Sequence, residues 1–183
     1  MEVKNAVISI ALVALLPLVA CHPSYWARTY RTAASGKCTE HPQFGYGPHS
    51  QRVFDDKATS YALSMDGQPK AELCPGTAYN LEVTFKSRRE LLITSSAGMI
   101  KPTKDGNSDC PNRVVINDVL NGASFTLTAP CHIPEGGVKV EVTSADFSDL
   151  NYKYSSVTFH KGDVCGPLPA HCPAAAAEGG HEF

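Results

Sequence analysis

Alternating apolar and polar residues dominate the middle of the chain and predict β-strands. The clearest run lies in the stretch 74–98, where every second residue is apolar: Tyr79, Leu81, Val83 and Phe85. A period of two places these side chains on one buried face and the intervening polar residues on a solvated face. The triplet Ser87-Arg88-Arg89 predicts a reversal with a solvated tip, followed by a second strand. We therefore expect a β-hairpin whose apolar side needs another sheet to cover it.

Further strands are expected on both sides of this hairpin. Apolar alternation or β-branched residues mark strands at 59–65, 113–120, 123–128, 138–142 and 152–159. Turn signals separate them, among them Asp66-Gly67 and Asn121-Gly122. About seven to eight short strands, with no convincing helical period after residue 21, predict an all-β fold of the immunoglobulin-like antiparallel β-sandwich kind. A closed barrel is the alternative.

The first 21 residues have the pattern of a secretory signal peptide. Lys4 supplies the positive charge, and an apolar run follows from Ala6 to Ala20. This run is short for a span of the ~30 Å hydrocarbon core of a bilayer, so we expect a signal helix that is removed on secretion. The alternatives are a retained membrane anchor and a lipid-anchored surface protein, because Cys21 ends a run that resembles a bacterial lipobox.

Three segments are therefore expected along the chain. Residues 1–21 form the signal peptide, and residues 22–165 form a β-sandwich domain with an irregular N-terminal arm. Residues 166–183 are rich in Pro, Ala and Gly and predict a flexible tail.

The cysteine count agrees with an oxidising, extracellular destination. Of the seven cysteines, six remain if Cys21 leaves with the signal or carries lipid: Cys38, Cys74, Cys110, Cys131, Cys165 and Cys172. An even number in a secreted protein predicts three disulfides. The short, proline-containing loop from Cys165 to Cys172 favours a local bridge there. Zinc binding is the competing interpretation, but the chain lacks the Cys and His spacings of zinc sites.

The net charge of −2 and the lack of any block of like charge narrow the range of partners. A nucleic-acid partner would require a basic face. An anionic membrane surface or an acidic substrate is disfavoured for the same reason. We expect contact with a membrane only if Cys21 is lipidated or the signal is retained.

The loop from His41 to His49 holds the candidate ligand-binding residues. It contains two glycines, two prolines and two aromatic residues, and the candidates in it are His41, Phe44, Tyr46 and His49. Aromatic rings in such a loop either form a binding platform or seal the core of the domain.

Copper binding is a second hypothesis for the histidines. Cleavage after Cys21 would leave His22 as the first residue, and its amine and imidazole suit copper. A second histidine would complete the site, and the candidates are His41, His49, His132 and His160. The ligand set that the copper hypothesis names is His22, His49 and His132. The protein would then be a copper-dependent oxidoreductase similar to lytic polysaccharide monooxygenases.

Motifs of hydrolytic enzymes are absent from the sequence. Neither G-x-S-x-G nor H-E-x-x-H occurs. Apart from the copper hypothesis, we therefore expect neither an enzyme nor a cofactor or metal.

A series of short motifs resembles a known family. It contains Pro75-Gly76-x-x-Tyr79-x-Leu81-x-Val83, Cys110-x-Asn112-x-Val114, Phe125-x-Leu127-x-Ala129-Pro130 and Val138-x-Val140-x-Val142-Thr143. In this order the motifs resemble a reeler domain, the extracellular β-sandwich of reelin N-termini, ferric-chelate-reductase-like proteins and insect defence proteins. The likeness covers roughly residues 38–160.

Two positions depart from the family pattern. Ile116-Asn117 stands where the family has a histidine, and Leu127-Thr128 replaces its tryptophan. The resemblance implies a secreted interaction module that binds a protein or glycan partner, and not an enzyme.

Overall fold

The computed structural model describes residues 38–42, 52–104, 106–145 and 152–173. All regular secondary structure in these ranges is β-strand, so the all-β prediction is confirmed. The expected signal helix lies outside them. Among the described residues, no helix has the length and apolar character needed to cross a membrane.

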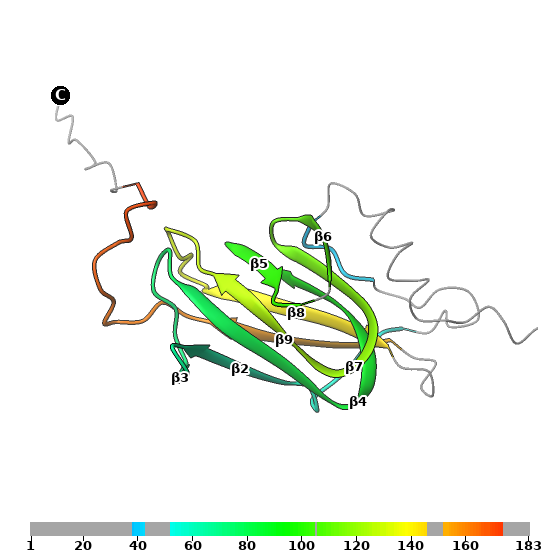
Figure 1. Ribbon diagram of the computed structural model, residues 1–183. Coiled ribbons are helices and arrows are strands. Elements are labelled where there is room, and N and C mark those ends of the chain that lie inside the picture. Colours follow the sequence, from blue (N-terminus) through cyan, green and yellow to red (C-terminus); the bar gives the residue numbers. More distant parts are fainter. Residues whose placement is uncertain (1–37, 43–51, 105, 146–151, 174–183) are drawn as a thin grey trace, which may run out of the picture.

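Within the described parts of the chain, nine strands form a single hydrogen-bonded sheet, and most of them are labelled in Figure 1. Their bounds are β1 Phe54–Asp55, β2 Ser60–Met65, β3 Gln68–Lys70, β4 Ala78–Ser95, β5 Met99–Pro102, β6 Asn107–Cys110, β7 Arg113–Thr128, β8 Val138–Ala145 and β9 Lys153–Phe159. One path through the sheet has the order β1-β9-β8-β4-β2-β3, and β7 lies on the other side of β4 with β5 and β6 beyond it.

Two long antiparallel strands, β4 and β7, hold this sheet together. On one side β4 pairs with β2 near its start and with β8 near its end, and on the other side it pairs with β7. The outer side of β7 pairs with β6 and then with β5. Each end of the β4–β7 pair thus belongs to a different group of strands, and the pair curves between them (Figure 1).

Both predicted turns within this pair are wrong. Ser87-Arg88-Arg89 lies inside β4, and Asn121-Gly122 lies inside β7. The two segments face each other across the ladder, where Thr84 pairs with Gly122 and Arg89 pairs with Leu120. The register shifts between these pairs, and such bulges bend a strand and increase its twist. Residues that resemble turns therefore curl one continuous sheet.

One large apolar cluster lies inside the curled sheet. The alternation predicted for β4 is confirmed, because Tyr79, Leu81, Val83 and Phe85 are all buried in this cluster. Strands from both ends of the β4–β7 pair contribute to it, including β2, β7, β8 and β9. Since the strands form one continuous sheet, the division into two sheets that an immunoglobulin-like sandwich requires is not confirmed.

A smaller apolar cluster lies on the opposite face of the sheet. Leu92 of β4 and Val115 of β7 are paired neighbours in this cluster, and Ala145, Tyr152 and the partly buried Val53 pack with them. This face is therefore also covered, which explains why both faces of β4 are buried near its end.

All six expected cysteines are paired. The three bridges are Cys38–Cys110, Cys74–Cys165 and Cys131–Cys172. The expected local bridge between Cys165 and Cys172 is wrong, because the backbone around Lys161 runs beside Leu73 and brings Cys165 to Cys74. Cys172, in the segment expected as a tail, is bonded back to Cys131 near the start of the β7–β8 connection.

Candidate functional site

A polar pocket of about 680 Å³ lies against β8 and β9, where the segment around His41 packs on the sheet. We call it the His41 pocket, and its lining residues are Thr39, Glu40, His41, Pro42, Arg52, Val53, Asp55, Glu141 and Tyr154. The Cys38–Cys110 disulfide attaches the His41 segment to the end of β6, three residues before His41. A covalent link so close to the pocket holds this wall in place.

His41 forms the inner wall of the pocket and is buried. Its Nδ1 lies 2.8 Å from the hydroxyl oxygen of Thr143, and its Nε2 lies 2.8 Å from that of Thr94. A neutral imidazole donates through one nitrogen and accepts through the other, and hydroxyl groups satisfy either role. Burial lowers the pKa of His41 to about 4, because the charged form loses solvation. His41 is therefore neutral at physiological pH.

Glu141 and Tyr154, which line the pocket, form a connected network with Lys139. The Glu141 carboxylate accepts a hydrogen bond of 2.8 Å from the Lys139 ammonium and another from the Tyr154 hydroxyl. The Lys139 ammonium also lies 5.8 Å from the centre of the Tyr154 ring, within the range of a cation–π contact. The Tyr154 ring in turn meets His41 edge-on at 5.9 Å.

The network keeps Glu141 ionised. Burial alone would raise the pKa of this carboxyl, but the hydrogen bonds from Lys139 and Tyr154 outweigh burial and hold the pKa below its ordinary value. The pKa of Tyr154 is raised, first by burial and then by its bond to Glu141. The pocket thus presents a carboxylate, a neutral phenol and a neutral imidazole in defined positions.

The groups in this pocket that acid–base chemistry would use already have hydrogen-bond partners. A general base must have a free nitrogen or oxygen near a reacting proton. Both ring nitrogens of His41 are within hydrogen-bond distance of threonine hydroxyls, and Glu141 is held by two donors. These contacts hold the pocket wall in position, and the exposed rim adds further polar side chains, among them Arg52 and Asp55.

The expected ligand-binding residues are only partly described by the structure. His41 lines the pocket, whereas Phe44, Tyr46 and His49 lie outside the described residues. Sequence reasoning missed Glu141 and Tyr154, which come from β8 and β9 more than 90 residues away along the chain. The alternation of β8 did place Glu141 between buried valines, but it could not show what covers that face.

The histidines of the copper hypothesis are not brought together within the described residues. His22 and His49 lie outside those residues, and His132 is exposed. His160 follows the end of β9 that pairs with the start of β8, whereas His41 contacts Thr143 near the other end of β8. The copper hypothesis therefore stays a prediction, because two of its ligands, His22 and His49, lie outside the described residues.

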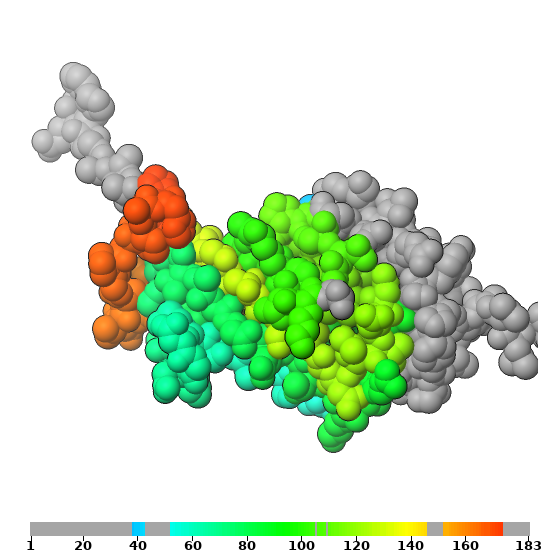
Figure 2. Space-filling view, viewed as in Figure 1, coloured from blue at the N-terminus to red at the C-terminus, as the bar shows by residue number. Residues whose placement is uncertain are grey.

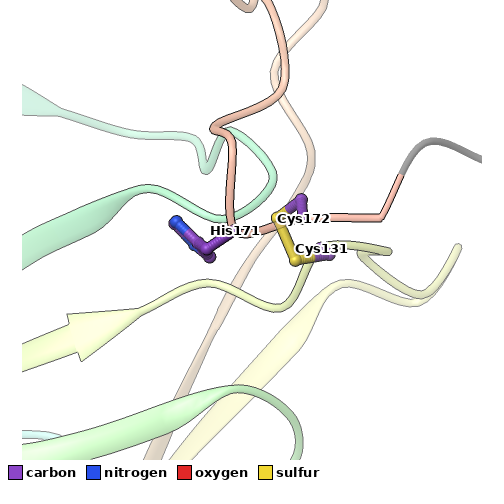
Figure 3. A group of neighbouring side chains, drawn as sticks. All are labelled: Cys131, His171 and Cys172. Atoms are coloured by element: carbon purple, nitrogen blue, oxygen red, sulfur yellow. A yellow bond between two sulfur atoms is a disulfide. The ribbon is translucent and has the colours of Figure 1, made fainter.

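A three-residue group of potential metal ligands does occur elsewhere. Cys131, His171 and Cys172 place one ligand atom each within 4.8 Å of one another (Figure 3). The two sulfur atoms are bonded to each other, so neither is a thiolate that could bind a metal in this state.

A second hollow, of about 480 Å³, lies over the bend in the β4–β7 pair. Its wall contains Glu82, Thr84, Lys104, Asp118 and the partly exposed Leu120. The described residues that line it include no aromatic side chain, and its charged groups are exposed. In contrast, the lining of the His41 pocket includes the aromatic ring of Tyr154, which belongs to a hydrogen-bonded network.

Comparison with known proteins identifies neighbours by shape alone. No family model matches the sequence, and no curated protein matches it. Three solved structures are similar, and all three are reeler domains of F-spondin. These neighbours belong to the family that the sequence motifs resemble.

The alignments with these structures cover most of each neighbour, but the TM-scores and sequence identities are low. The human F-spondin reeler domain (fragment 1) has a TM-score of 0.44 at 14% identity, over 59% of this chain and 92% of that one. A second structure, of the Reelin-N domain of F-spondin, has a TM-score of 0.45 at 13% identity, over 72% of this chain and 97% of that one. The human F-spondin reeler domain (fragment 2) has a TM-score of 0.41 at 13% identity, over 69% of this chain and 98% of that one.

Proposed function

We propose that this protein is a secreted interaction module that binds an extracellular protein or glycan partner in the His41 pocket. The observation that carries the proposal is the network of Glu141, Tyr154 and Lys139, which holds polar groups in defined positions beside an exposed rim. Pockets that place a few polar groups next to an aromatic ring are typical of ligand-binding sites.

Pre-organisation supports binding at this place. The pocket wall is attached through Cys38–Cys110, and the His41 ring is held between Thr94 and Thr143. Side chains that are already ordered lose less conformational entropy when a ligand arrives. The rim adds charge of both signs, since Glu40 and Asp55 accompany Arg52. A partner with hydroxyl groups or with mixed charges matches such a lining.

Secretion is supported by the three disulfides. Disulfides persist in oxidising compartments and are rare in the cytosol of most cells. The signal-like pattern of residues 1–21 fits the same destination. N-terminal sequencing of the exported protein tests this part: we expect a start near residue 22, and a chain that retains Met1 would contradict it.

The binding proposal is tested with the full secreted chain on a glycan array and on an array of displayed extracellular proteins. A Glu141→Ala/Tyr154→Ala variant is measured in parallel, with Glu82→Ala on the exposed face of β4 as the matched control. We expect to find a partner whose affinity for the control variant is within about twofold of that for the parent chain. Its affinity for the double variant should be lower by at least about tenfold, as when hot-spot residues of an interface are removed.

Two results would contradict the proposal. One is the absence of any partner on both arrays. The other is a partner whose affinity is unchanged in the double variant, which would place binding elsewhere on the molecule. Circular dichroism of the variants separates lost binding from lost folding, and the class of array that gives the signal decides between a protein and a glycan.

A further inference from the structure

The group formed by Cys131, His171 and Cys172 lies at one end of the sheet, away from the His41 pocket. Residues 161–173 form the orange-to-red segment at this end (Figure 2). Each of the three residues contributes one ligand atom, and all three atoms lie within 4.8 Å of one another. Figure 3 shows His171 and Cys172 side by side on this segment, with Cys131 on the facing connection.

We propose that Cys131, His171 and Cys172 form a redox-gated binding site for a soft or borderline divalent cation of the zinc type. In the oxidised state the two sulfurs are bonded and the site is closed. When a dithiol reductant opens this bridge, two thiolates and one imidazole become available. Two sulfurs and one nitrogen are ligands that Zn²⁺ prefers, and a fourth position is left for water or for another ligand.

The chemistry balances in two steps. A dithiol reductant attacks one sulfur, the Cys131–Cys172 bond breaks, and the reductant leaves as its own disulfide with both electrons transferred. Cys131 and Cys172 are then thiols. The metal binds both sulfurs and one ring nitrogen of His171, and the two thiol protons are released to solvent.

The geometry requires only small movements. In a tetrahedral zinc site two sulfur ligands are about 3.8 Å apart, and a sulfur and a nitrogen about 3.6 Å apart, given metal distances of about 2.3 and 2.1 Å. The three ligand atoms already lie within 4.8 Å. Rotation of the side chains therefore suffices, and the backbone can stay in place.

Gly76 makes room for the ligand atoms. A Cβ atom built on Gly76 would lie 2.4 Å from the Cys172 sulfur and 3.2 Å from His171 Nε2. Both atoms therefore occupy the space that a side chain at residue 76 would take. Gly76 also has a φ of 67°, which disfavours other residues there. This close approach keeps sulfur and imidazole together.

The surroundings of the three disulfides favour opening of the Cys131–Cys172 bridge. Among the described residues, the Cys131–Cys172 bridge is the only one with an imidazole in the same group, and an imidazole N–H can donate a hydrogen bond to a departing thiolate. Carbonyl oxygens of Gly162 and Leu73 lie 3.5 and 3.9 Å from the Cys165 sulfur, and their partial negative charge opposes a thiolate. Cys110 of the third bridge and Cys172 of this one are buried to nearly the same degree, with 8% and 7% of their surfaces exposed, so the neighbouring imidazole and not burial distinguishes these two bridges.

The proposal is tested on the full chain by graded reduction with a dithiol under anaerobic conditions, alkylation, and mass spectrometry. We expect Cys131 and Cys172 to be alkylated first, while the other four cysteines stay paired. Addition of equimolar Zn²⁺ before alkylation should then protect both thiols. Co²⁺ in place of Zn²⁺ should give the intense thiolate charge-transfer absorption of a tetrahedral site.

Two histidine variants separate this site from unspecific binding. His171→Ala should weaken Zn²⁺ and Co²⁺ binding to the reduced chain by at least about tenfold, because one of three protein ligands is lost. His132→Ala is the matched control, since His132 is exposed and adjacent to Cys131 as His171 is to Cys172, yet lies outside the group. It should change binding by less than about twofold.

Several outcomes would overturn the proposal. Another bridge could open first, or the reduced chain could show no thiolate absorption with Co²⁺. Equal effects of the two histidine variants would also contradict it. Circular dichroism is recorded throughout, and loss of the β-sheet signal when only this bridge opens counts against the proposal as well.

Discussion

Arg89 donates a hydrogen bond from Nη1 to Oδ2 of Asp56, and the two side chains are only 4% and 8% exposed. Arg89 comes from β4, whereas Asp56 follows β1 at the far edge of the sheet. Burial alone would raise the pKa of Asp56, but the bonds from Arg89, Thr59 and the Ala58 backbone hold it below its ordinary value. The guanidinium also lies 5.2 Å from the centre of the Phe85 ring.

Replacement of Arg89 by methionine should therefore destabilise the fold strongly. The change leaves the Asp56 carboxylate buried without its charged partner, and breaking a buried pair in this way costs about 3–5 kcal/mol. Urea denaturation followed by circular dichroism measures the loss. Arg88→Met is the matched control, because Arg88 is exposed, and it should change stability by less than about 1 kcal/mol. Similar losses in both variants would show that the pair is unimportant.

Gly122 should tolerate no side chain. It pairs with Thr84 at the bend, and a Cβ on Gly122 would lie 2.6 Å from the backbone oxygen of Val83. We expect Gly122→Ala to cost about 1–3 kcal/mol, because the backbone must shift. Gly136→Ala is the control, since a Cβ there meets nothing within 4 Å. Thermal denaturation of the two variants compares them, and an unchanged melting temperature for Gly122→Ala would contradict the close approach.

Glu90 should make stability depend on pH near neutrality. Its side chain is fully buried, and burial together with the charge of Asp118 raises its pKa to about 7. The folded chain thus holds a proton that the unfolded chain releases near pH 4.5, so stability falls as the pH rises from about 4.5 to 7. Denaturation gives the free energy of unfolding at pH 5 and at pH 8. The decrease between these two pH values should be larger in the parent chain than in Glu90→Gln, by on the order of 2 kcal/mol. Equal differences would refute this assignment.

His41 should titrate far below the ordinary pKa of a histidine. Its folded pKa of about 4 lies below the ordinary 6.5, so the unfolded chain binds a proton first and stability falls as the pH drops from 6.5 towards 4. NMR titration of the imidazole resonances measures this directly. Thr94→Val and Thr143→Val remove one hydroxyl each and identify which ring nitrogen depends on which threonine. A His41 midpoint near 6.5 would mean that the ring is solvated.

The disulfide connectivity can be checked by peptide mapping without reduction. We expect peptides that join Cys38 to Cys110, Cys74 to Cys165 and Cys131 to Cys172, and no peptide that joins Cys165 to Cys172. Removal of Cys131 and Cys172 together by serine should cost about 4 kcal/mol by loop-closure entropy, given the separation of 41 residues. A Cys165–Cys172 peptide would contradict the connectivity.

The candidate site was only partly accessible from the sequence. His41 was a candidate because of its unusual loop, and it does line the pocket. Glu141 was one polar residue among several in an alternating strand. Its importance depends on Tyr154, which reaches it across the β8–β9 ladder, where Thr143 pairs with Tyr154. A contact between strands has no signature in the order of residues along either strand.

The sequence by itself determined the all-β class, the buried face of β4 and the set of six paired cysteines. Alternation along a strand is a local pattern that fixes which side chains share a face, and an even number of cysteines is a property of the composition. Tertiary structure alone decided the rest. Ser87-Arg88-Arg89 and Asn121-Gly122 have turn-like composition, yet they lie opposite each other as bulges, since pairing along two long strands satisfies more backbone groups than two separate turns would. The same curl brings Arg89 to Asp56, and the path of the chain beside Leu73 brings Cys165 to Cys74.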